Sequence, residues 1–356
     1  MSAYLIRRLI QMVIVLIISS MAIYTLLNMV PGGPFDGLMQ NADAKTRVTP
    51  EQIERMNAML GLDKPPAIRF IAWATGDDWM GVLDEAWAGD GRGIIRGDFG
   101  MSFKERRPVL EMMGDRIKKT VVITGLSAIL AIVIAIPIGI FSAVRQYSKA
   151  DYAVTLFTFI GTAIPGFWFA LMAIVLFGIK FQDWGLPQLP TKGWASLRAP
   201  RPGTLTHTLG VTQGSLADVA LHLMIPVVVL GLLQMAGWTR FMRSSMLEVL
   251  QQDYVRTARA KGLGERFVVI KHALRNALIP LVTIVTFELP FLFGGTILLE
   301  QIFSIPGMGL MYFEGLSQFD WPVVQGYLLI SAVLTVIATL LSDILYTVVD
   351  PRIRLG

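Results

Sequence analysis

The chain has 356 residues, of which 54% are apolar and only 16% are charged, against roughly 25% charged residues in an ordinary soluble domain. This composition excludes a disordered chain and a disulfide-linked scaffold, because apolar residues are abundant and cysteine is absent. The net charge of +5 is spread too thinly for a nucleic-acid-binding protein and fits a cationic membrane protein better. With no cysteine and three histidines, the chain offers no thiolate ligand and little for a histidine metal site.

The charged residues avoid six long windows, which hold only two formal charges, Glu288 and Asp343. A helix needs about 20 apolar residues to cross hydrocarbon roughly 30 Å thick, and the strands of a membrane barrel are much shorter. We therefore predict an all-α polytopic membrane protein with six transmembrane helices, over residues 9–30, 120–144, 152–179, 219–239, 277–299 and 323–349.

The first window resembles a secretory signal peptide in one respect, because Arg7 and Arg8 precede its apolar run. A signal core has roughly 7–15 residues and ends at a small-x-small cleavage site. This window is longer, and Pro31-Gly32-Gly33-Pro34 follows it. We therefore predict that residues 1–30 form a short terminus and a retained first helix.

The segment 31–119 separates the first two spans and carries 13 basic and 14 acidic residues. Thr49 and Pro50 read as the N-cap and first position of a helix that ends at Gly61. The glycine- and aspartate-rich stretch 76–93 reads as a loop. In a second long connector, about 180–218, Trp184 and Trp194 are interpreted as interface anchors, with ligand stacking as the alternative.

Basic residues in the remaining connectors predict the orientation in the membrane. Short loops rich in Lys and Arg face the cytoplasm, whereas long segments translocate largely regardless of charge. One set of connectors holds 14 basic and five acidic residues, in the ranges 1–8, 145–151, 240–276 and 350–356. Both termini and the tail 350–356 are therefore predicted to be cytoplasmic, and segment 31–119 extracytoplasmic.

The loop 240–276 carries the most informative pattern. Asp253 is predicted to cap a short helix over 254–261, which Gly262 closes, and a second helix is predicted to begin near Glu265. Basic side chains alternate there with small ones, at Arg256, Ala258, Arg259, Ala260 and Lys261. Small residues permit close approach of another protein and basic ones attract an acidic partner. A basic helix beside lipid headgroups is the alternative.

Two formal charges stand inside the later spans. Glu288 lies near the middle of the fifth span, where an ionisable residue is costly and indicates function unless it is paired or protonated. We predict that Glu288 lines a translocation path and meets cationic groups of the substrate, with an interhelix hydrogen bond as the alternative. Asp343 is interpreted as a structural cap or an interface group, and Pro306-Gly307-Met308-Gly309 as a rigid outer turn or a simple helix stop.

Residues 253–263 read Asp-Tyr-Val-Arg-Thr-Ala-Arg-Ala-Lys-Gly-Leu. This block resembles the signature of the integral membrane subunits of binding-protein-dependent ABC importers, whose general form is Glu-Ala-Ala, three residues, then Gly. Arg256 and Thr257 stand where the general form has Glu and the first Ala. The block is similar to the form that this signature takes in the dipeptide, oligopeptide and nickel branch.

Other segments resemble the first of the two permease subunits of that branch. They are Tyr4-Leu-Ile-Arg-Arg-Leu9, Leu60-Gly-Leu-Asp-Lys-Pro65, Gly97-Asp-Phe-Gly-Met-Ser102, Glu300-Gln-Ile-Phe-Ser-Ile-Pro-Gly-Met-Gly309 and Asp350-Pro-Arg-Ile353. The resemblance covers nearly the whole chain. The stretches 76–93 and 195–217 look longer than the usual connectors of the family.

The resemblance implies the type I ABC importer permease fold, with a five-helix core over 120–349 and a large extracytoplasmic segment between the first two helices. It implies that the short helix of loop 240–276 is a coupling helix on an ATPase subunit. The residues that match are Asp253, Tyr254, Arg256, Thr257, Ala258, Arg259, Lys261, Gly262 and Leu263. The sequence holds no Gly-Lys dipeptide and hence no Walker A loop, so ATP and Mg²⁺ are expected in partner subunits and no cofactor or metal in this chain.

The implied partners are a homologous second permease, two cytoplasmic ATPase subunits, an extracytoplasmic substrate-binding protein and the lipid bilayer, with no nucleic acid. The implied location is the plasma (inner) membrane of a bacterium or archaeon, and the implied cargo is peptides or related small solutes. Candidate residues for docking the binding protein are Gly97, Asp98, Phe99, Gly100, Pro306, Gly307 and Gly309.

Two other classes of function compete with this reading. A stand-alone secondary transporter or channel would more often show inverted repeats and several intramembrane carboxylates. A membrane-embedded enzyme would need more buried reactive groups than Glu288 and Asp343. We therefore predict an importer permease that is not itself an enzyme and has no catalytic residues.

Overall fold

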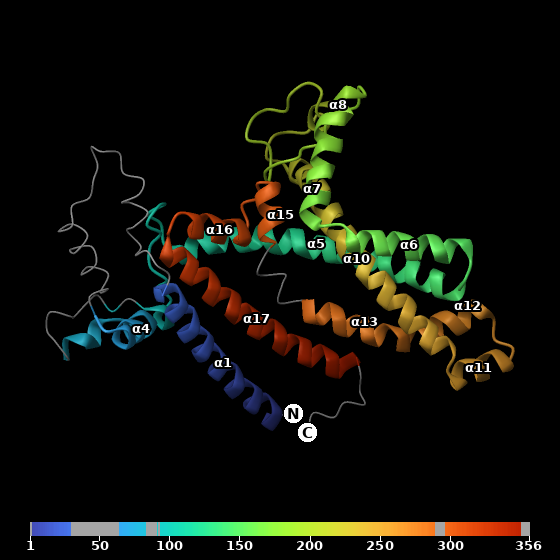
Figure 1. Cartoon of the computed structure of the whole chain (residues 1–356), viewed down its shortest axis with the longest axis horizontal. Helices are drawn as coiled ribbons and strands as arrows, with labels where there is room; N and C mark the ends of the chain where they lie inside the picture. Colours follow the sequence, from blue (N-terminus) through green and yellow to red (C-terminus); the bar gives the residue numbers. More distant parts are fainter. Residues whose placement is uncertain (1, 30–63, 83–90, 92, 289–295, 350–356) are drawn as a thin grey trace. The chain divides into compact units, whose positions relative to one another are not determined.

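The computed structural model describes residues 2–29, 64–82, 91, 93–288 and 296–349 (Figure 1). Within these ranges the ordered elements are helical, and β pairing is limited to isolated bridges such as Met101 with Pro108. Six helices of the described ranges are long and apolar enough to cross a membrane. The predicted all-α architecture with six candidate spans is therefore confirmed.

The chain divides into two compact units. The first consists of residues 1–118 and 311–336, and the second of residues 119–310 and 337–356. Three helices continue from one unit into the other, namely α5 (Val109–Val144), α16 (Met308–Ser317) and α17 (Trp321–Val349).

In the first unit an aromatic cluster joins the two N-terminal helices. The ring of Tyr24 lies 5.6 Å from that of Phe70 and 5.3 Å from that of Trp73, measured between centroids. The predicted helix ending at Gly61 and residues 83–90 and 92 of the predicted loop lie outside the described residues. The elements of this unit before α5 are α1 (Ser2–Met29), α4 (Pro66–Thr75), η1 (Asp78–Val82) and η3 (Ile94–Arg96).

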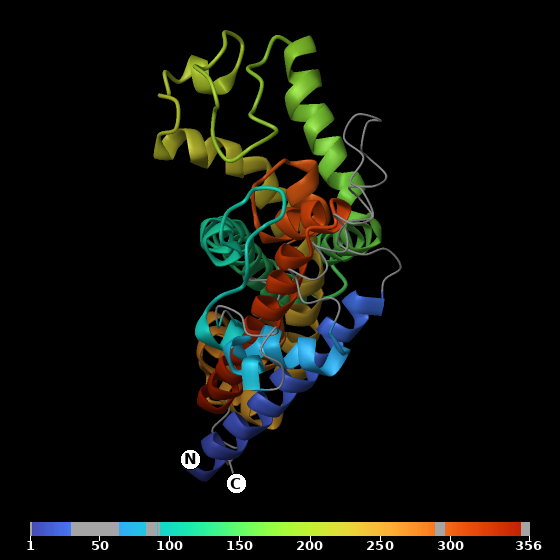
Figure 2. The same ribbon diagram turned by 90° about the vertical axis from the view of Figure 1, so that its left-hand side faces the viewer.

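The second unit is built around the long helix α10. Figure 2 shows the loop after α8 folding beside α7 and α8 and returning to the start of α10. In that loop Trp184 is exposed, whereas Trp194 packs on the core. The remaining elements of the unit are α6 (Lys149–Ala163), α7 (Gly166–Ile174), η4 (Val175–Lys180), α8 (Phe181–Asp183), α9 (Leu205–Thr208), α10 (Leu216–Leu250), α11 (Asp253–Ala260), α12 (Glu265–Phe267), the π-helix η5 (Val268–Ala273), α13 (Leu274–Glu288) and α15 (Ile297–Ile302).

The predicted third span, 152–179, is wrong as a single helix. Pro165 has no N–H to donate, and the residue before a proline is held in an extended conformation. Ile164 has φ −75° and ψ 126°, so α6 ends there and α7 begins at Gly166. Figure 1 shows α6 and α7 meeting at a steep angle. The candidate span is therefore Gly166–Asp183.

Other predicted spans have the right place but different ends. The second helix begins at Val109 rather than 120, and the fourth runs over Leu216–Leu250 rather than 219–239. The fifth candidate span, Glu265–Thr286, begins before residue 277. Residues 289–295 of the predicted fifth span and the tail 350–356 lie outside the described residues.

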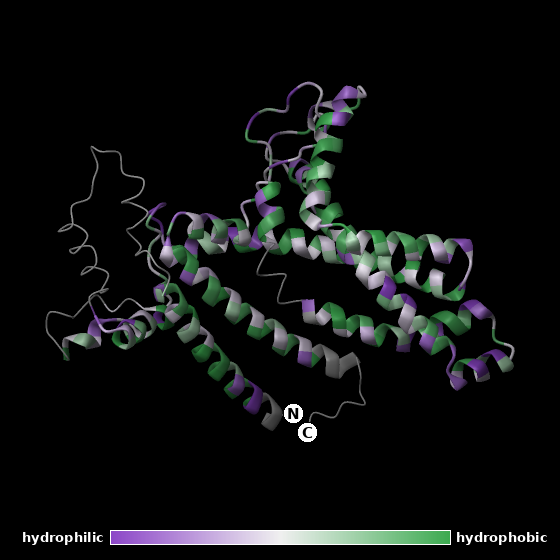
Figure 3. Cartoon of the chain, in the orientation of Figure 1, coloured by the Kyte–Doolittle hydropathy of each residue, from purple (hydrophilic) through white to green (hydrophobic). Residues whose placement is uncertain are grey.

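Two hydrophobic clusters form the core of the second unit. One joins the ends of α5 and α10 to α11, η5 and α13, through residues such as Met242, Met246 and Val255. The other joins the first half of α10 to α7 and the turn after α15, where Phe303 and Ile305 are buried. Figure 3 shows hydrophobic residues along α5, α7 and α10 and hydrophilic residues gathered at α11. The polar loop predicted to carry function is thus anchored on a buried core.

Candidate functional site

The short helix α11 occupies the predicted place in the loop after α10. It runs over Asp253–Ala260, within one residue of the prediction, and Gly262 follows with φ +74°. Glycine adopts this left-handed conformation without steric penalty, so the predicted closing role of Gly262 is confirmed. The predicted capping role of Asp253 is wrong, because the N-cap is Gln252 and no side chain caps the helix.

The inner face of α11 packs on its own chain. Val255 is fully buried and Ala258 is 6% exposed, both in the cluster that contains Met242, Met246 and Val268. We predicted that Ala258 permits close approach of another protein, but its methyl group faces this core. Ala258 therefore holds α11 against α10 and η5, and any partner must use the opposite face.

The outer face of α11 and the turn after it is exposed to solvent. Tyr254 is 41% exposed, Leu263 is 38% exposed, and the Arg256 side chain is 69% exposed and lies 3.8 Å from the Asp253 carboxylate. We call this surface the docking face and define it as Tyr254, Arg256, Thr257, Ala260, Lys261 and Leu263. It combines two cations with apolar and small side chains, which suits a partner surface that is part acidic and part apolar.

Two side-chain contacts fix the turn that presents the docking face. Arg259 binds Glu265 through two hydrogen bonds, of 3.1 Å from Nε and 2.7 Å from Nη2, and this contact raises the pKa of the guanidinium. Asn276 Nδ2 donates to the hydroxyl of Tyr254 at 2.8 Å. The carboxylate of Glu265 thus neutralises Arg259. Of the predicted basic set, Arg256 has only a long, exposed contact with Asp253, so Arg256 and Lys261 remain the cations that a partner can reach.

Glu288 lies where α13 packs beside α10. It is partly buried, and its carboxylate accepts a hydrogen bond of 3.2 Å from the indole Nε1 of Trp238. In the same region the hydroxyl of Ser342 donates to the carbonyl oxygen of Thr286 at 2.6 Å. The Trp238 contact is an interhelix hydrogen bond of the kind considered as the alternative, and it leaves carboxylate acceptor positions that one N–H cannot fill.

In the first unit the predicted docking residues 97–100 form a tight turn. Gly97 and Gly100 have φ +83° and +79°, which explains both glycines. Asp98 accepts a hydrogen bond from the backbone N–H of Gly100 at 2.8 Å. The next residues are held by Asp320, whose carboxylate accepts from the hydroxyl of Ser102 and from the N–H of Phe103. These contacts give the turn a fixed shape.

The predicted outer turn 306–309 packs around a buried carboxylate, Glu300, which is 2% exposed. The hydroxyl of Thr120 and the N–H of Leu310 each donate to it at 2.9 Å, and burial raises the pKa of Glu300. A Cβ on Gly307 would lie 2.5 Å from the Glu300 carboxyl carbon, so a larger residue there would displace this carboxyl group. The turn is therefore a packed structural element as well as a candidate contact surface.

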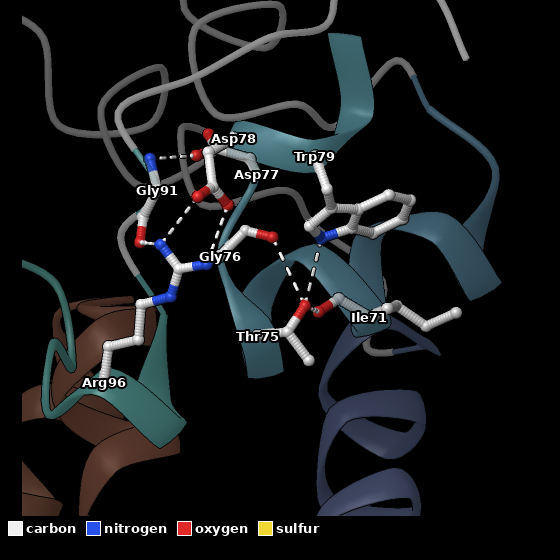
Figure 4. A network of polar contacts seen from close by, with 8 residues as sticks. All are labelled: Ile71, Thr75, Gly76, Asp77, Asp78, Trp79, Gly91 and Arg96. Atoms are coloured by element: carbon white, nitrogen blue, oxygen red, sulfur yellow. Dashed lines mark hydrogen bonds and ion pairs between the residues drawn. The ribbon is translucent and has the colours of Figure 1, made fainter. Parts of the chain in front are cut away.

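A polar network orders part of the segment between the first two spans (Figure 4). Arg96 donates to both oxygens of Asp78, at 2.8 and 2.9 Å, and to the carbonyl of Gly91. Asp77 accepts from the N–H of Gly91 at 2.8 Å. These contacts join Asp77 and Asp78 to Gly91 and Arg96. The stretch 76–93 was predicted only as a loop.

Sequence reasoning missed a buried ionic cluster at the α5–α6 turn. Asp151 is 2% exposed and binds Arg243 of α10 through hydrogen bonds of 2.7 and 2.8 Å. The hydroxyl of Ser142 and the N–H of Tyr147 also donate to the carboxylate. The spacing Ser148-x-x-Asp151 is typical of a helix start and could have placed Asp151, because Ser148 caps α6. Nothing in the sequence paired it with Arg243.

Among the residues that the structure describes, no group of three or more His, Asp or Glu side chains could hold a metal ion.

Comparison with known proteins gives matches over nearly the whole chain. Residues 135–355 match the model of the binding-protein-dependent transport system inner membrane component, and residues 1–124 match that of the N-terminal part of such membrane components. The oligopeptide transport system permease protein AppB of Bacillus subtilis is 37% identical over 355 residues, covering 99% of this chain and 100% of the relative. The dipeptide transport system permease protein DppB of Escherichia coli is 35% identical over 362 residues, covering 99% of each.

A solved structure has a similar fold. It is a chain of the MetNI methionine ABC transporter in an inward-facing conformation, with a TM-score of 0.50 and 18% sequence identity. The match covers 68% of this chain and 97% of that one. At this identity the likeness concerns the fold alone, and it agrees with the predicted importer permease architecture.

Proposed function

The chain belongs to the family of binding-protein-dependent transport system inner membrane components, and from that premise we propose that it is the membrane permease of a peptide importer driven through α11. It is a multi-pass membrane protein and a permease subunit of an ABC importer. Such a subunit works with ATPase subunits and a substrate-binding protein. The proposal concerns the substrate, the residues that couple transport to ATP hydrolysis, and the remaining partners.

One observation supports the coupling proposal: the docking face lies on a helix that is packed against the core of its own chain. Val255 and Ala258 fix α11 on the core of the second unit, and the exposed Arg259–Glu265 ion pair orders the turn after it. An exposed helix that is anchored on one side transmits a displacement instead of yielding to it, because packed interiors deform little. The docking face then seats on an ATPase subunit, with Arg256 and Lys261 meeting acidic side chains.

The proposed substrate class rests on the names of the similar proteins. AppB and DppB are named for oligopeptide and dipeptide transport, and each aligns with 99% of this chain. We propose peptides as the substrate class, delivered by an extracytoplasmic binding protein that contacts the turn 97–100 and the turn 306–309. Glu288 is proposed to line the path and to meet the ammonium group of the peptide with the carboxylate acceptor positions that Trp238 does not occupy.

The proposed assembly contains a second, homologous permease and two ATPase subunits that bind ATP and Mg²⁺. Both termini and α11 face the cytoplasm in this proposal, because the basic connectors then obey the positive-inside rule. The membrane is the plasma membrane of a bacterium or archaeon. This chain itself supplies no ATPase activity and no cofactor in the proposal.

Site-directed crosslinking tests the docking face directly, because the chain contains no cysteine of its own. We expect Thr257→Cys to form a crosslink to an ATPase subunit in the assembled complex. Leu197→Cys is the matched control, since Leu197 is 94% exposed but lies in the connector predicted to face the other side. A Thr257→Cys complex that is active but never crosslinks would contradict the assignment of α11.

Reconstitution in vesicles tests the transport function. We expect uptake of a labelled dipeptide only with binding protein, ATP and the ATPase subunits present. Uptake by this chain without ATPase subunits would instead indicate a stand-alone transporter and would overturn the proposal.

A further inference from the structure

The path from the docking face into the membrane helices runs through α10. Helix α10 continues to Leu250, and α11 begins three residues later at Asp253. Met242 and Met246 of α10 are fully buried in the same cluster as Val255 and Ala258. The last two turns of α10 and α11 therefore form one packed body.

A buried carboxylate connects this body to the α5–α6 hairpin. Arg243, next to Met242, donates two hydrogen bonds to Asp151, from Nε at 2.7 Å and from Nη2 at 2.8 Å. Ser142 at the end of α5 and Tyr147 in the turn supply the other two donors. A carboxylate has about four acceptor positions, so Asp151 is saturated by groups from α5, the turn and α10. We call Asp151, Arg243, Ser142 and the N–H of Tyr147 the Asp151 cluster.

The backbones around the Asp151 cluster approach closely. A Cβ on Gly139 of α5 would lie 2.7 Å from Cβ of Met242, and a Cβ on Gly161 of α6 would lie 2.8 Å from Cβ of Ala236. Small residues at such crossings let membrane helices pack backbone to backbone. Two crossings and one bidentate ion pair thus fix α5 and α6 against the segment of α10 that leads to α11.

We propose that the Asp151 cluster is the joint through which movement of α11 drives the α5–α6 hairpin during transport. This inference rests on the proposed docking of α11 on an ATPase subunit, and it assigns Asp151 and Arg243 as positioning residues. A bidentate arginine–carboxylate pair fixes direction as well as distance. A displacement of the end of α10 is therefore passed to the hairpin with little loss. Lysine in place of Arg243 keeps the charge but has no planar fork, so the joint becomes loose while the charge pair survives.

The coupling ratio tests the joint. In vesicles containing the assembled complex, we expect Asp151→Asn and Arg243→Lys to lower the number of peptides imported per ATP hydrolysed by about fivefold or more, the low end of typical coupling between sites. Asp183→Asn is the matched control, because it makes the same change in an exposed ion pair with Lys180 of the same unit. A purely structural cluster would lower the yield of complex and leave the ratio of the assembled fraction within about fivefold of wild type, and that result would overturn the proposal.

A distance measurement tests the joint without weakening it. Spin labels at Gln146→Cys and Gln251→Cys lie on exposed positions of the α5–α6 turn and of the α10–α11 junction, outside the docking face. We expect one distance distribution in the wild-type background that does not change between the nucleotide-free and ATP-bound states, and a distribution that shifts with nucleotide in Arg243→Lys. A shift in the wild-type background would overturn the proposal. If the proposed function itself is wrong, the Thr257→Cys crosslink and uptake by the wild-type complex are both absent. The two failures can therefore be told apart.

Discussion

Two bidentate arginine–aspartate pairs among the described residues lie in different surroundings. Arg243 and Asp151 lie in the second unit with side chains 26% and 3% exposed, whereas Arg96 and Asp78 lie between the first two spans with side chains 47% and 46% exposed. The hydrogen-bond lengths are nearly the same, 2.7 and 2.8 Å in one pair and 2.8 and 2.9 Å in the other. Geometry alone therefore does not tell which pair matters.

Burial makes the difference between the two pairs. Exposed ion pairs are screened by water and salt and contribute little to stability. A buried carboxylate that loses its partner is left charged in a medium that solvates it poorly, so breaking such a pair is strongly destabilising. We infer that the Asp151 pair determines the arrangement of α5, α6 and α10, and that the Asp78 pair only orders a local loop.

The largest expected effect comes from removing Arg243. Arg243→Ala leaves the buried carboxylate of Asp151 with only Ser142 and Tyr147 as donors, and we expect a loss of about 3–5 kcal/mol in the free energy of unfolding. Asp151→Ala should cost less, because the partly exposed guanidinium of Arg243 can be hydrated. Reversible unfolding in mixed detergent micelles measures both losses. An Asp151→Ala variant less stable than Arg243→Ala would contradict this account of the asymmetry.

Acid should weaken the same cluster. The hydrogen bonds from Arg243 are the main reason that the pKa of the Asp151 carboxyl lies well below its usual range, near 3.9. The unfolded chain therefore binds this proton at a higher pH than the folded chain does. The stabilisation by Asp151 is present above about pH 4 and is lost as the pH falls toward the folded pKa.

Unfolding as a function of pH measures this loss. Arg243→Ala serves as the control, because without the guanidinium the pKa of Asp151 rises toward its ordinary value. We expect a shallower decrease in stability below about pH 4 in this variant than in the wild type. Parallel curves for the two proteins would show that another carboxylate governs the acid sensitivity.

The contrast between the two pairs also shows what the sequence could predict. The six charge-poor windows predicted the spans because hydrocarbon excludes charge over about 20 residues, and Gly262 predicted the end of α11 because a local conformation requires glycine. Both signals lie within a short stretch of chain. Arg243 and Asp151 are 92 positions apart, and no local pattern pairs them.

The same reason explains the errors at the candidate site. Ala258 looked available to a partner because its neighbours in sequence are charged, but it is buried in the cluster that contains Met242 and Met246. Arg259 looked like a free cation, and Glu265 neutralises it. The break at Pro165 could have been predicted, because proline restricts the conformation of the residue before it. Hydropathy does not register this restriction, so the predicted span ran across the break.

A smaller effect is expected from Ser142. Ser142→Ala removes one neutral donor from the Asp151 carboxylate and leaves both bonds from Arg243 in place. We expect a loss of about 1–2 kcal/mol in the free energy of unfolding, because one acceptor position of a buried group is left unfilled. Ser20→Ala is the matched control, since its hydroxyl donates only to a carbonyl of its own exposed helix. Equal losses in the two variants would mean that the cluster adds nothing to an ordinary serine contact.

The smallest effect is expected from Asp78→Asn, which changes the exposed pair. This variant removes the charge of the exposed pair while the contact of Arg96 with the Gly91 carbonyl stays. Since the carboxylate and the guanidinium are both reached by water, we expect no measurable change in the thermal midpoint at about 1 M salt, where the Debye length is only about 3 Å. A loss as large as that of Arg243→Ala, persisting at high salt, would mean that bidentate geometry outweighs burial. Burial would then no longer distinguish the Asp151 cluster as the joint, since the exposed Arg96–Asp78 pair would satisfy the same criterion.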